Sequence, residues 1–183
     1  TVESELIPKL NNSIVEVTRC EYCGPGTKLL GSLNKLEKNS LLILADDDHI
    51  YKDDMIEKFC YFYNRDPNNA YSFYVYPLEN SPVGQGADGF AINTNHLQGI
   101  KDFYEKIVKD YKELFLYDDL WISYFLFFFV NSIKATPKII TNPPRKTCLG
   151  GSSPNKKIDV INPVKGRRSK TGITLLTGYF LKT

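Results

Sequence analysis

Three adjacent aspartates follow a run of aliphatic residues in the first third of the chain. The segment LLILA at 41–45 is built for burial, and Asp46, Asp47 and Asp48 follow it directly. In an open parallel sheet, ligands bind outside the carboxyl ends of the strands, so a buried strand would deliver these acids to that edge. Side chains alternate along an extended segment, so we expect Asp46 and Asp48 to face one side and Asp47 the other. Adjacent carboxylates need a cation between them, and hard oxygen ligands suit Mg²⁺ or Mn²⁺.

These acids have two other possible roles, as calcium ligands in an EF-hand loop or as a cap of the following helix. In an EF-hand calcium loop, Asp46, Asp48 and Glu57 would take positions 1, 3 and 12. Ile50 would then stand where a ligand is needed and Tyr51 where glycine is required, so the EF-hand is excluded. Capping of the following helix would explain one acid rather than three, and this alternative stays open.

Composition bounds the class of protein. The 183 residues suit one domain spanning 1–183, with 42% hydrophobic and 24% charged residues typical of a soluble globular fold. Lys and Arg number 23 against 21 Asp and Glu, so the net charge of +2 gives no support for a nucleic-acid partner. The longest apolar run, at 120–130, is too short for a membrane span, which needs about 20 residues.

The C-terminal segment of the domain, 137–183, is basic. Ten Lys and Arg residues fall between 138 and 182 against one acid, Asp159. A segment of this kind is a candidate for facing phosphates, and a solvated basic surface is the equally weighted alternative.

The cysteines indicate a reducing compartment. Cys20, Cys23, Cys60 and Cys148 are few for this length and no signal peptide precedes them, so we expect a cytoplasmic protein without a disulfide framework. Cys20 and Cys23 form a C-x-x-C, but a second pair of ligands at short spacing is missing, which disfavours zinc. Glycine and proline directly after Cys23 favour a turn rather than the helix of a redox motif.

Periodicity predicts alternating helices and strands. Apolar spacing predicts helices at 1–12, 52–66, 101–115 and 117–133, and a short helix after a glycine turn within 23–38. Strands are predicted at 13–20, 41–45 and 70–78. A glycine-rich loop leads into a strand and turn at 81–100, and strand with long loops is expected after 136. The pattern favours an α/β fold with a mostly parallel central sheet flanked by helices. Because the chain starts at a helix without an initiator Met, we expect an N-terminal strand to be missing from it.

Four segments in one order resemble a known family. They are CEYCGPGTKLLGSL at 20–33, LLILADDDHIY at 41–51, GADGFAI at 86–92 and YDDLWISYFL at 117–126. In this order they resemble the G-P-x-T-K-L segment, the DxD motif, the acceptor-side glycine loop and the acidic helix start of GT-A nucleotide-sugar glycosyltransferases. Within that family the resemblance is to domains that large algal viruses, the chloroviruses, encode for capsid glycans, which would place the activity in the host cytoplasm.

The resemblance implies roles for the acidic residues. Asp48, with Asp46, would hold the metal ion, and Asp46 or Asp47 would contact the donor nucleotide. A divalent cation stabilises the charge that builds on a leaving diphosphate. Asp119 and Asp118 are the candidate catalytic bases, with Asp119 favoured, because an inverting transfer needs a carboxylate near the acceptor hydroxyl. Acids at a helix start are also common without catalysis, since the helix dipole stabilises them there.

Five further residues complete the implied donor site. Lys28 would contact nucleotide or phosphates, or be solvated at an exposed helix start. Asp88, Gly89 and Trp121 would shape the sugar pockets, although glycine and tryptophan could equally serve core packing. Arg167, in KGRRSKTG, would clamp the diphosphate from a closing loop.

The function implied is a metal-dependent transfer from a nucleotide sugar, taken to be a UDP-sugar, to a glycan or glycoprotein, with inversion. One alternative is a sugar-phosphate nucleotidyltransferase, although the chain lacks the N-terminal glycine-rich phosphate loop that such an enzyme needs. The other alternative is a non-catalytic domain that binds glycans or a partner protein. Sequence alone leaves all three open.

Overall fold

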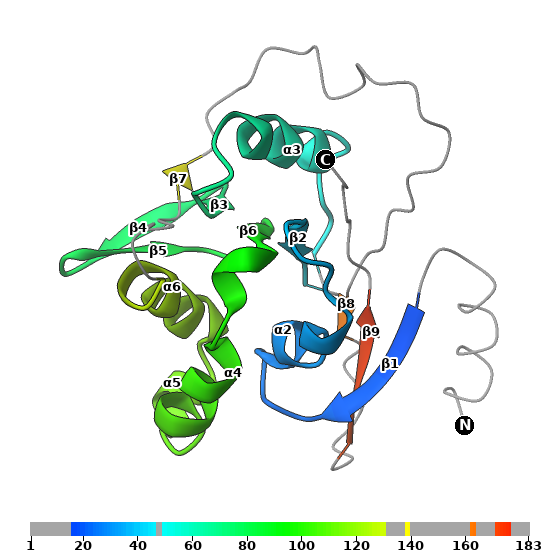
Figure 1. Ribbon diagram of the computed structural model, residues 1–183, viewed down its shortest axis with the longest axis vertical. Coiled ribbons are helices and arrows are strands. Elements are labelled where there is room, and N and C mark those ends of the chain that lie inside the picture. The colour runs from blue at the N-terminus through cyan, green and yellow to red at the C-terminus, as the bar shows by residue number, and fades with distance from the viewer. Residues whose placement is uncertain (1–15, 47–48, 131–137, 140–161, 164–170, 177–183) are drawn as a thin grey trace.

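The computed structural model describes residues 16–46, 49–130, 138–139, 162–163 and 171–176. The predicted helix at 1–12 and most of the basic segment lie outside these ranges. Within them the chain forms a mixed α/β fold (Figure 1). The α/β class expected from the sequence is therefore confirmed.

Short elements make up the fold. The strands are β1 (Glu16–Glu21), β2 (Leu41–Leu44), β3 (Tyr71–Ser72), β4 (Val75–Leu78), β5 (Ser81–Gly84), β6 (Phe90–Asn93), β7 (Lys138–Ile139), β8 (Asn162–Pro163) and β9 (Thr171–Leu176). The helices are α2 (Thr27–Leu30), α3 (Met55–Arg65), α4 (Ile100–Phe103), α5 (Lys112–Phe115) and α6 (Asp118–Phe128), with 3₁₀ turns η1 (Leu33–Lys35) and η2 (Thr94–Leu97) and a π-helical segment η3 (Tyr104–Val108).

The described strands form three small sheets. Their orders are β1-β9-β8, β2-β6-β3-β7 and β4-β5. Of the pairings between these strands, only β3 with β7 is parallel, and the others are antiparallel. The sequence pattern of β2 predicts burial on both faces and does not specify the direction of its neighbour, which is why the antiparallel partner β6 was not foreseen.

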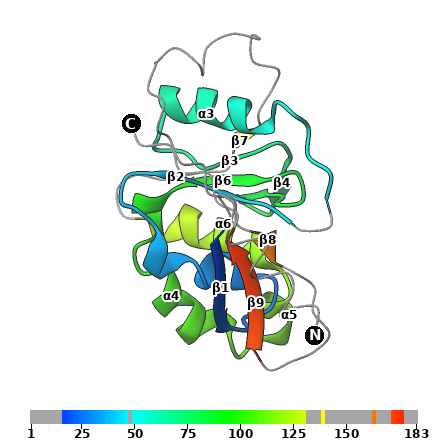
Figure 2. The ribbon, with the colours of Figure 1, turned by 90° about the vertical axis from the view of Figure 1, so that its right-hand side faces the viewer.

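Strand β2 lies between two hydrophobic layers. Leu41 and Ile43 face α3, where they pack with Met55 and Phe59, while Leu42 and Leu44 join the core formed with α2, α4 and α6. Figure 2 shows α3 on one side of this sheet and the other helices on the opposite side. All four β2 residues are at most 2% exposed. Truncating one of them to alanine should cost about 2–5 kcal/mol, as is usual for a buried Leu or Ile.

The strand predicted at 70–78 is interrupted after Ser72. The Ser72 hydroxyl donates to the carbonyls of Tyr74 and Gln85, at 2.8 and 2.7 Å, and the chain then continues as β4. Strands β4 and β5 form an antiparallel hairpin with Leu78 opposite Ser81. The hairpin packs on α6, where the amide of Gly84 donates to the Ser123 hydroxyl at 3.1 Å (Figure 1).

The helix predicted at 101–115 forms three short pieces instead of one. It begins after Gly99, whose φ of +85° suits glycine, and passes from α4 through η3 to a break before α5. Helix α6 confirms the helix predicted from 117, over eleven residues. In the described part of the chain, no helix combines the length and apolar character needed to cross a membrane.

Candidate functional site

The acidic loop begins where β2 ends. Asp46 is the first residue after the buried strand, and its Oδ1 lies 2.6 Å from Lys28 Nζ. Its backbone is tied to the hydroxyl of Tyr51, which accepts from the Asp46 amide and donates to the Asp46 carbonyl. Asp47 and Asp48 lie outside the described residues, so the predicted difference between their sides of the strand stays a prediction.

Lys28 occupies the middle of the site because a glycine turn brings it there. The turn Gly24-Pro25-Gly26 leads into α2, and the Thr27 hydroxyl closes it by accepting from the Cys23 amide and donating to the Gly24 carbonyl. Gly24 has a φ of +63°, which favours glycine. The first turn of α2 then points the lysine into the interior.

The ammonium of Lys28 joins two carboxylates from distant parts of the chain. Its Nζ lies 2.6 Å from Asp46 Oδ1 and 2.9 Å from Asp118 Oδ2, and the residue is only 3% exposed. Burial by itself lowers the pKa of this lysine, but the charges of Asp118 and Asp46 outweigh it and raise the pKa above its ordinary value. The solvated alternative for Lys28 is therefore wrong, because both carboxylates hold it below the surface.

Asp119, one residue further along α6, has no such cation. Its Oδ2 accepts from the backbone amide of Gly86 at 2.7 Å, and among the described contacts this is the bond that holds it. Burial and the neighbouring charge of Asp118 raise the pKa of Asp119 to about 6, against the opposing effects of the Gly86 hydrogen bond and Lys28. The carboxylate is thus a stronger base than an ordinary aspartate and is still ionised at neutral pH.

Gly86 can approach Asp119 only because it has no side chain. A Cβ placed on Gly86 would collide with both the Oδ1 and the Cγ of Asp119. The loop of the predicted acceptor-side motif is therefore fitted around the carboxylate, and its glycine supplies a backbone donor at a distance that a larger residue could not reach.

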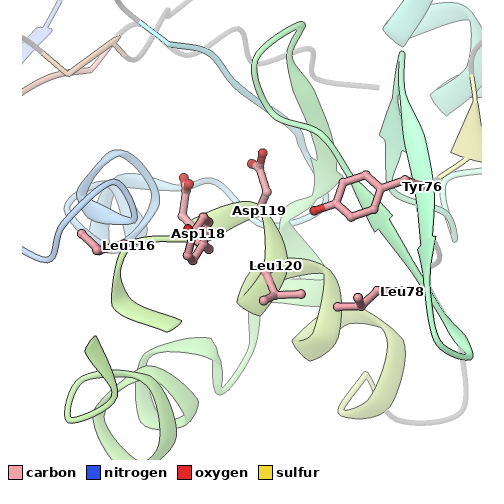
Figure 3. A pocket seen from close by; sticks show the side chains of 7 residues that line it. Tyr76, Leu78, Leu116, Asp118, Asp119 and Leu120 are labelled. Carbon is pink, nitrogen blue, oxygen red and sulfur yellow. The ribbon is translucent and has the colours of Figure 1, made fainter. Parts of the chain in front are cut away.

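A cavity of about 430 Å³ lies beside these acids. It is bounded by the start of α6 and by the β4–β5 hairpin, and Figure 3 shows the Tyr76 hydroxyl directed toward Asp119, with Leu78 and Leu120 beneath. Burial and the charge of Asp119 raise the pKa of Tyr76, so this phenol stays protonated. The lining consists of Tyr76, Leu78, Leu116, Tyr117, Asp118, Asp119 and Leu120.

Asp88 and Gly89 are the last two residues of the glycine-rich loop at 86–89, directly before β6. Asp88 Oδ1 is 3.1 Å from His49 Nε2, and this exposed contact joins the glycine loop to the residues just after the acidic loop. Gly89 has a φ of +101°, and a Cβ there would meet the Phe59 ring at 2.9 Å. Gly89 thus serves packing against α3, and neither residue lines the cavity.

Trp121 is a core residue in this structure. It is 1% exposed, its indole lies against Gly26, where an added Cβ would be 2.6 Å from the ring, and its ring centroid is 5.7 Å from that of Tyr104. The core-packing alternative describes this side chain, because a ring buried in this way has no face free for a sugar. It links the glycine turn to α6 and so helps to position Lys28 next to Asp118.

The described residues do not form a metal site by themselves. No three His, Cys, Asp or Glu side chains among them lie close enough together to hold a metal ion. Asp46, one of the two predicted ligands, is paired with Lys28, and Asp48, the other, lies outside the described residues, as does Arg167. Metal ligation therefore stays a prediction that depends on Asp48.

The structure brings together Lys28, Asp46, Asp118 and Asp119, which the sequence predicted as separate site residues. It adds Tyr76 and Gly86, which the sequence did not single out. For Gly86 the available signal was its place in GADGFAI, and for Tyr76 it was the alternation of YVYPL before a turn. Neither signal specifies which side chain would face Asp119.

No protein-family model, curated protein or solved structure matches this chain. A function for it therefore has to be argued from the chemistry of the site. The site has two main chemical features, a basic carboxylate at a cavity and a buried ion-pair network beside it.

Proposed function

We propose that the protein is a metal-dependent glycosyltransferase of the GT-A type, which moves a sugar from a UDP-sugar to a glycan or glycoprotein acceptor with inversion. The observation that carries the proposal is Asp119, a carboxylate with a pKa of about 6 at the wall of a cavity. Order of motifs adds support, since the four family-like segments contribute Lys28, Asp46, Gly86 and Asp119 to one place.

Asp119 has the properties that a general base needs. Proton transfer is most effective when the pKa of the base lies near the working pH, and a pKa of about 6 meets this condition while leaving the group ionised at pH 7. The Gly86 amide fixes one carboxylate oxygen, Oδ2, and so orients the group. Asp119 would take the proton of an acceptor hydroxyl as that oxygen attacks the anomeric carbon from the face opposite the leaving diphosphate.

Asp118, the acid next to Asp119, has a positioning role in the proposal. Asp118 and Asp46 share Lys28, which connects the end of β2 to the start of α6. This connection would keep the acidic loop and the base in a fixed relation, as precise positioning of reacting groups requires. The small number of cysteines, four in 183 residues, fits the cytoplasmic setting that we propose.

The donor side of the proposal rests on the acidic loop. When bound through Asp48, Mn²⁺ or Mg²⁺ would offset the charge that develops on the leaving diphosphate. Asp46 would face the donor with the oxygen that Lys28 does not hold, and Arg167 from the basic segment would contact the phosphates.

Activity with a panel of nucleotide sugars, in the presence of Mn²⁺, tests the proposal. Release of nucleoside diphosphate with transfer to a saccharide is expected, and Asp119→Asn should lower kcat by about 10²- to 10⁴-fold, the usual contribution of a general base. Asp110→Asn is the matched control, since Asp110 is an exposed acid away from the cavity, and its kcat should equal that of the unchanged protein.

Four results would contradict the proposal. Full activity in Asp119→Asn would exclude Asp119 as the general base. Product with retained anomeric configuration would exclude an inverting mechanism. Release of pyrophosphate in place of nucleoside diphosphate would identify a nucleotidyltransferase instead. If Asp48→Asn did not weaken the binding of Mn²⁺ in the presence of UDP, Asp48 would not be a metal ligand.

A further inference from the structure

The charges around the cavity restrict what it can bind. Among the residues that the structure describes, its lining holds two carboxylates, Asp118 and Asp119, and no Lys, Arg or His. Lys28 reaches Asp118 from below the surface and is only 3% exposed, so a ligand in the cavity would not meet its charge directly. An anionic ligand such as a nucleotide phosphate or an acidic sugar would be repelled here.

The same carboxylates select for hydrogen-bond donors. An ionised carboxylate only accepts hydrogen bonds, and Asp119 is ionised above a pH of about 6. A ligand that offers hydroxyl groups would satisfy the oxygen of Asp119 that Gly86 leaves unbonded in the described contacts. A neutral polyol meets this requirement without an opposing charge.

The rest of the lining is apolar and open to solvent. Tyr76 is 39% exposed and Tyr117 is 62% exposed, and Leu78 and Leu116 are also largely exposed. Large apolar side chains usually lie inside, so this gathering beside an acid indicates a binding surface. Sugar rings present C–H groups on their faces and hydroxyls at their edges, and so match a pocket that has both kinds of wall.

We propose that this cavity is the acceptor subsite and that it takes a neutral saccharide, with a sugar ring packed on Tyr76 and a hydroxyl directed at Asp119. The inference rests on the proposed function and specifies an acceptor without acidic groups. Tyr76 is the residue that determines acceptor binding. It stands on β4, and its hydroxyl points to the base in Figure 3.

Binding of simple glycosides tests the charge preference without donor or metal. The probes are methyl glycosides of the common neutral hexoses and pentoses, with methyl glucuronide as the acidic match. Titration at pH 8 is followed by amide NMR shifts at 117–120. We expect at least one neutral glycoside to bind about tenfold more tightly than the glucuronide, a difference of about 1.4 kcal/mol. Equal or tighter binding of the acidic sugar, or no binding of any neutral sugar, would overturn the proposal.

Variants of Tyr76 test the wall of the cavity. Tyr76→Leu removes the ring and should weaken binding of the neutral glycoside about three- to tenfold, in line with the worth of an aromatic contact. Tyr76→Phe keeps the ring and should stay within about twofold. Tyr74→Leu is the control, because Tyr74 is exposed just before the same hairpin and does not line the cavity. Equal losses in the Tyr74 and Tyr76 variants would count against the proposal.

Kinetics separate this inference from the proposed function. In a transfer assay Tyr76→Leu should raise the acceptor KM about three- to tenfold and leave the donor KM unchanged. If transfer occurs and the acceptor KM is unaltered, the acceptor subsite is wrong and the glycosyltransferase stands. If neutral glycosides bind as expected and no donor is turned over, the subsite stands and the catalytic proposal fails.

Discussion

The two acids at the start of α6 lie in contrasting surroundings. Asp118 is 7% exposed and shares the buried ammonium of Lys28 with Asp46, so its charge is compensated. Asp119 lies at the cavity, holds a single backbone amide, and feels the charge of its neighbour, so its pKa is raised to about 6. Adjacent residues of the same type thus have opposite electrostatic situations.

Under the proposed function, this contrast separates a structural carboxylate, Asp118, from a catalytic one, Asp119. The ion pairs of Lys28 with Asp46 and Asp118 hold three segments together, and the charges of these groups offset one another. An uncompensated charge destabilises the fold, and strongly shifted pKa values of this kind cluster at functional sites. Four substitutions examine this distinction, and the largest effect is expected in the ion-pair network.

Lys28→Met should lower the free energy of unfolding by about 3–5 kcal/mol, because it leaves Asp46 and Asp118 without their shared cation. Urea denaturation at pH 7 measures this change. The double variant Lys28→Met with Asp118→Leu should recover much of the loss, since it removes the more buried of the two carboxylates left without a cation. A single variant that loses less than about 1 kcal/mol would show that the network contributes little.

Asp119→Asn should stabilise the protein at alkaline pH. The folded pKa of about 6 lies above the ordinary value of 3.8, so this group favours the folded state most at low pH, and that contribution is lost as pH rises through 6. The variant minus unchanged-protein difference in the free energy of unfolding should therefore be about 1–3 kcal/mol more favourable to the variant at pH 8 than at pH 4. Denaturation curves across that range measure it, and a pH-independent difference between the two proteins would contradict the raised pKa.

Gly86→Ala should cost about 1–3 kcal/mol, because the added Cβ forces the Asp119 carboxylate away from the amide that it accepts from. A double-mutant cycle with Asp119→Ala tests the cause. In the Asp119→Ala background most of the cost should disappear. If the cost persists there, it comes from the loop backbone and the contact with Asp119 is incidental.

His49→Gln should change the free energy of unfolding by less than about 0.5 kcal/mol. His49 and Asp88 are both exposed, with side chains 38% and 50% accessible, and exposed pairs contribute little. Thermal or urea denaturation measures the effect, with Asp88→Asn as the companion variant. A loss comparable to that of Lys28→Met would mean that burial does not explain the contrast between the two pairs.

Sequence patterns indicated which residues could belong to the site, but they did not indicate which side chains those residues would contact. The aliphatic run of β2 and the acids at 46 and 118–119 follow from periodicity and position, because burial and helix starts leave local signals. The partnership of Lys28 with Asp118 spans ninety positions, and no local pattern encodes it. The break after Ser72 was also missed, since its cause is a side-chain hydroxyl bonded to Gln85, thirteen residues away.

The exposed strand β4 has a consequence for how the protein can diversify. Three of its four residues, Tyr76, Pro77 and Leu78, are exposed, whereas its partner β5 buries Val83 and Gly84 toward the interior. Changes in β4 therefore alter the wall of the cavity while leaving the hydrophobic layers intact. Selection for new ligands can act on this strand at little cost in stability, so β4 is where related chains should differ most in what they recognise.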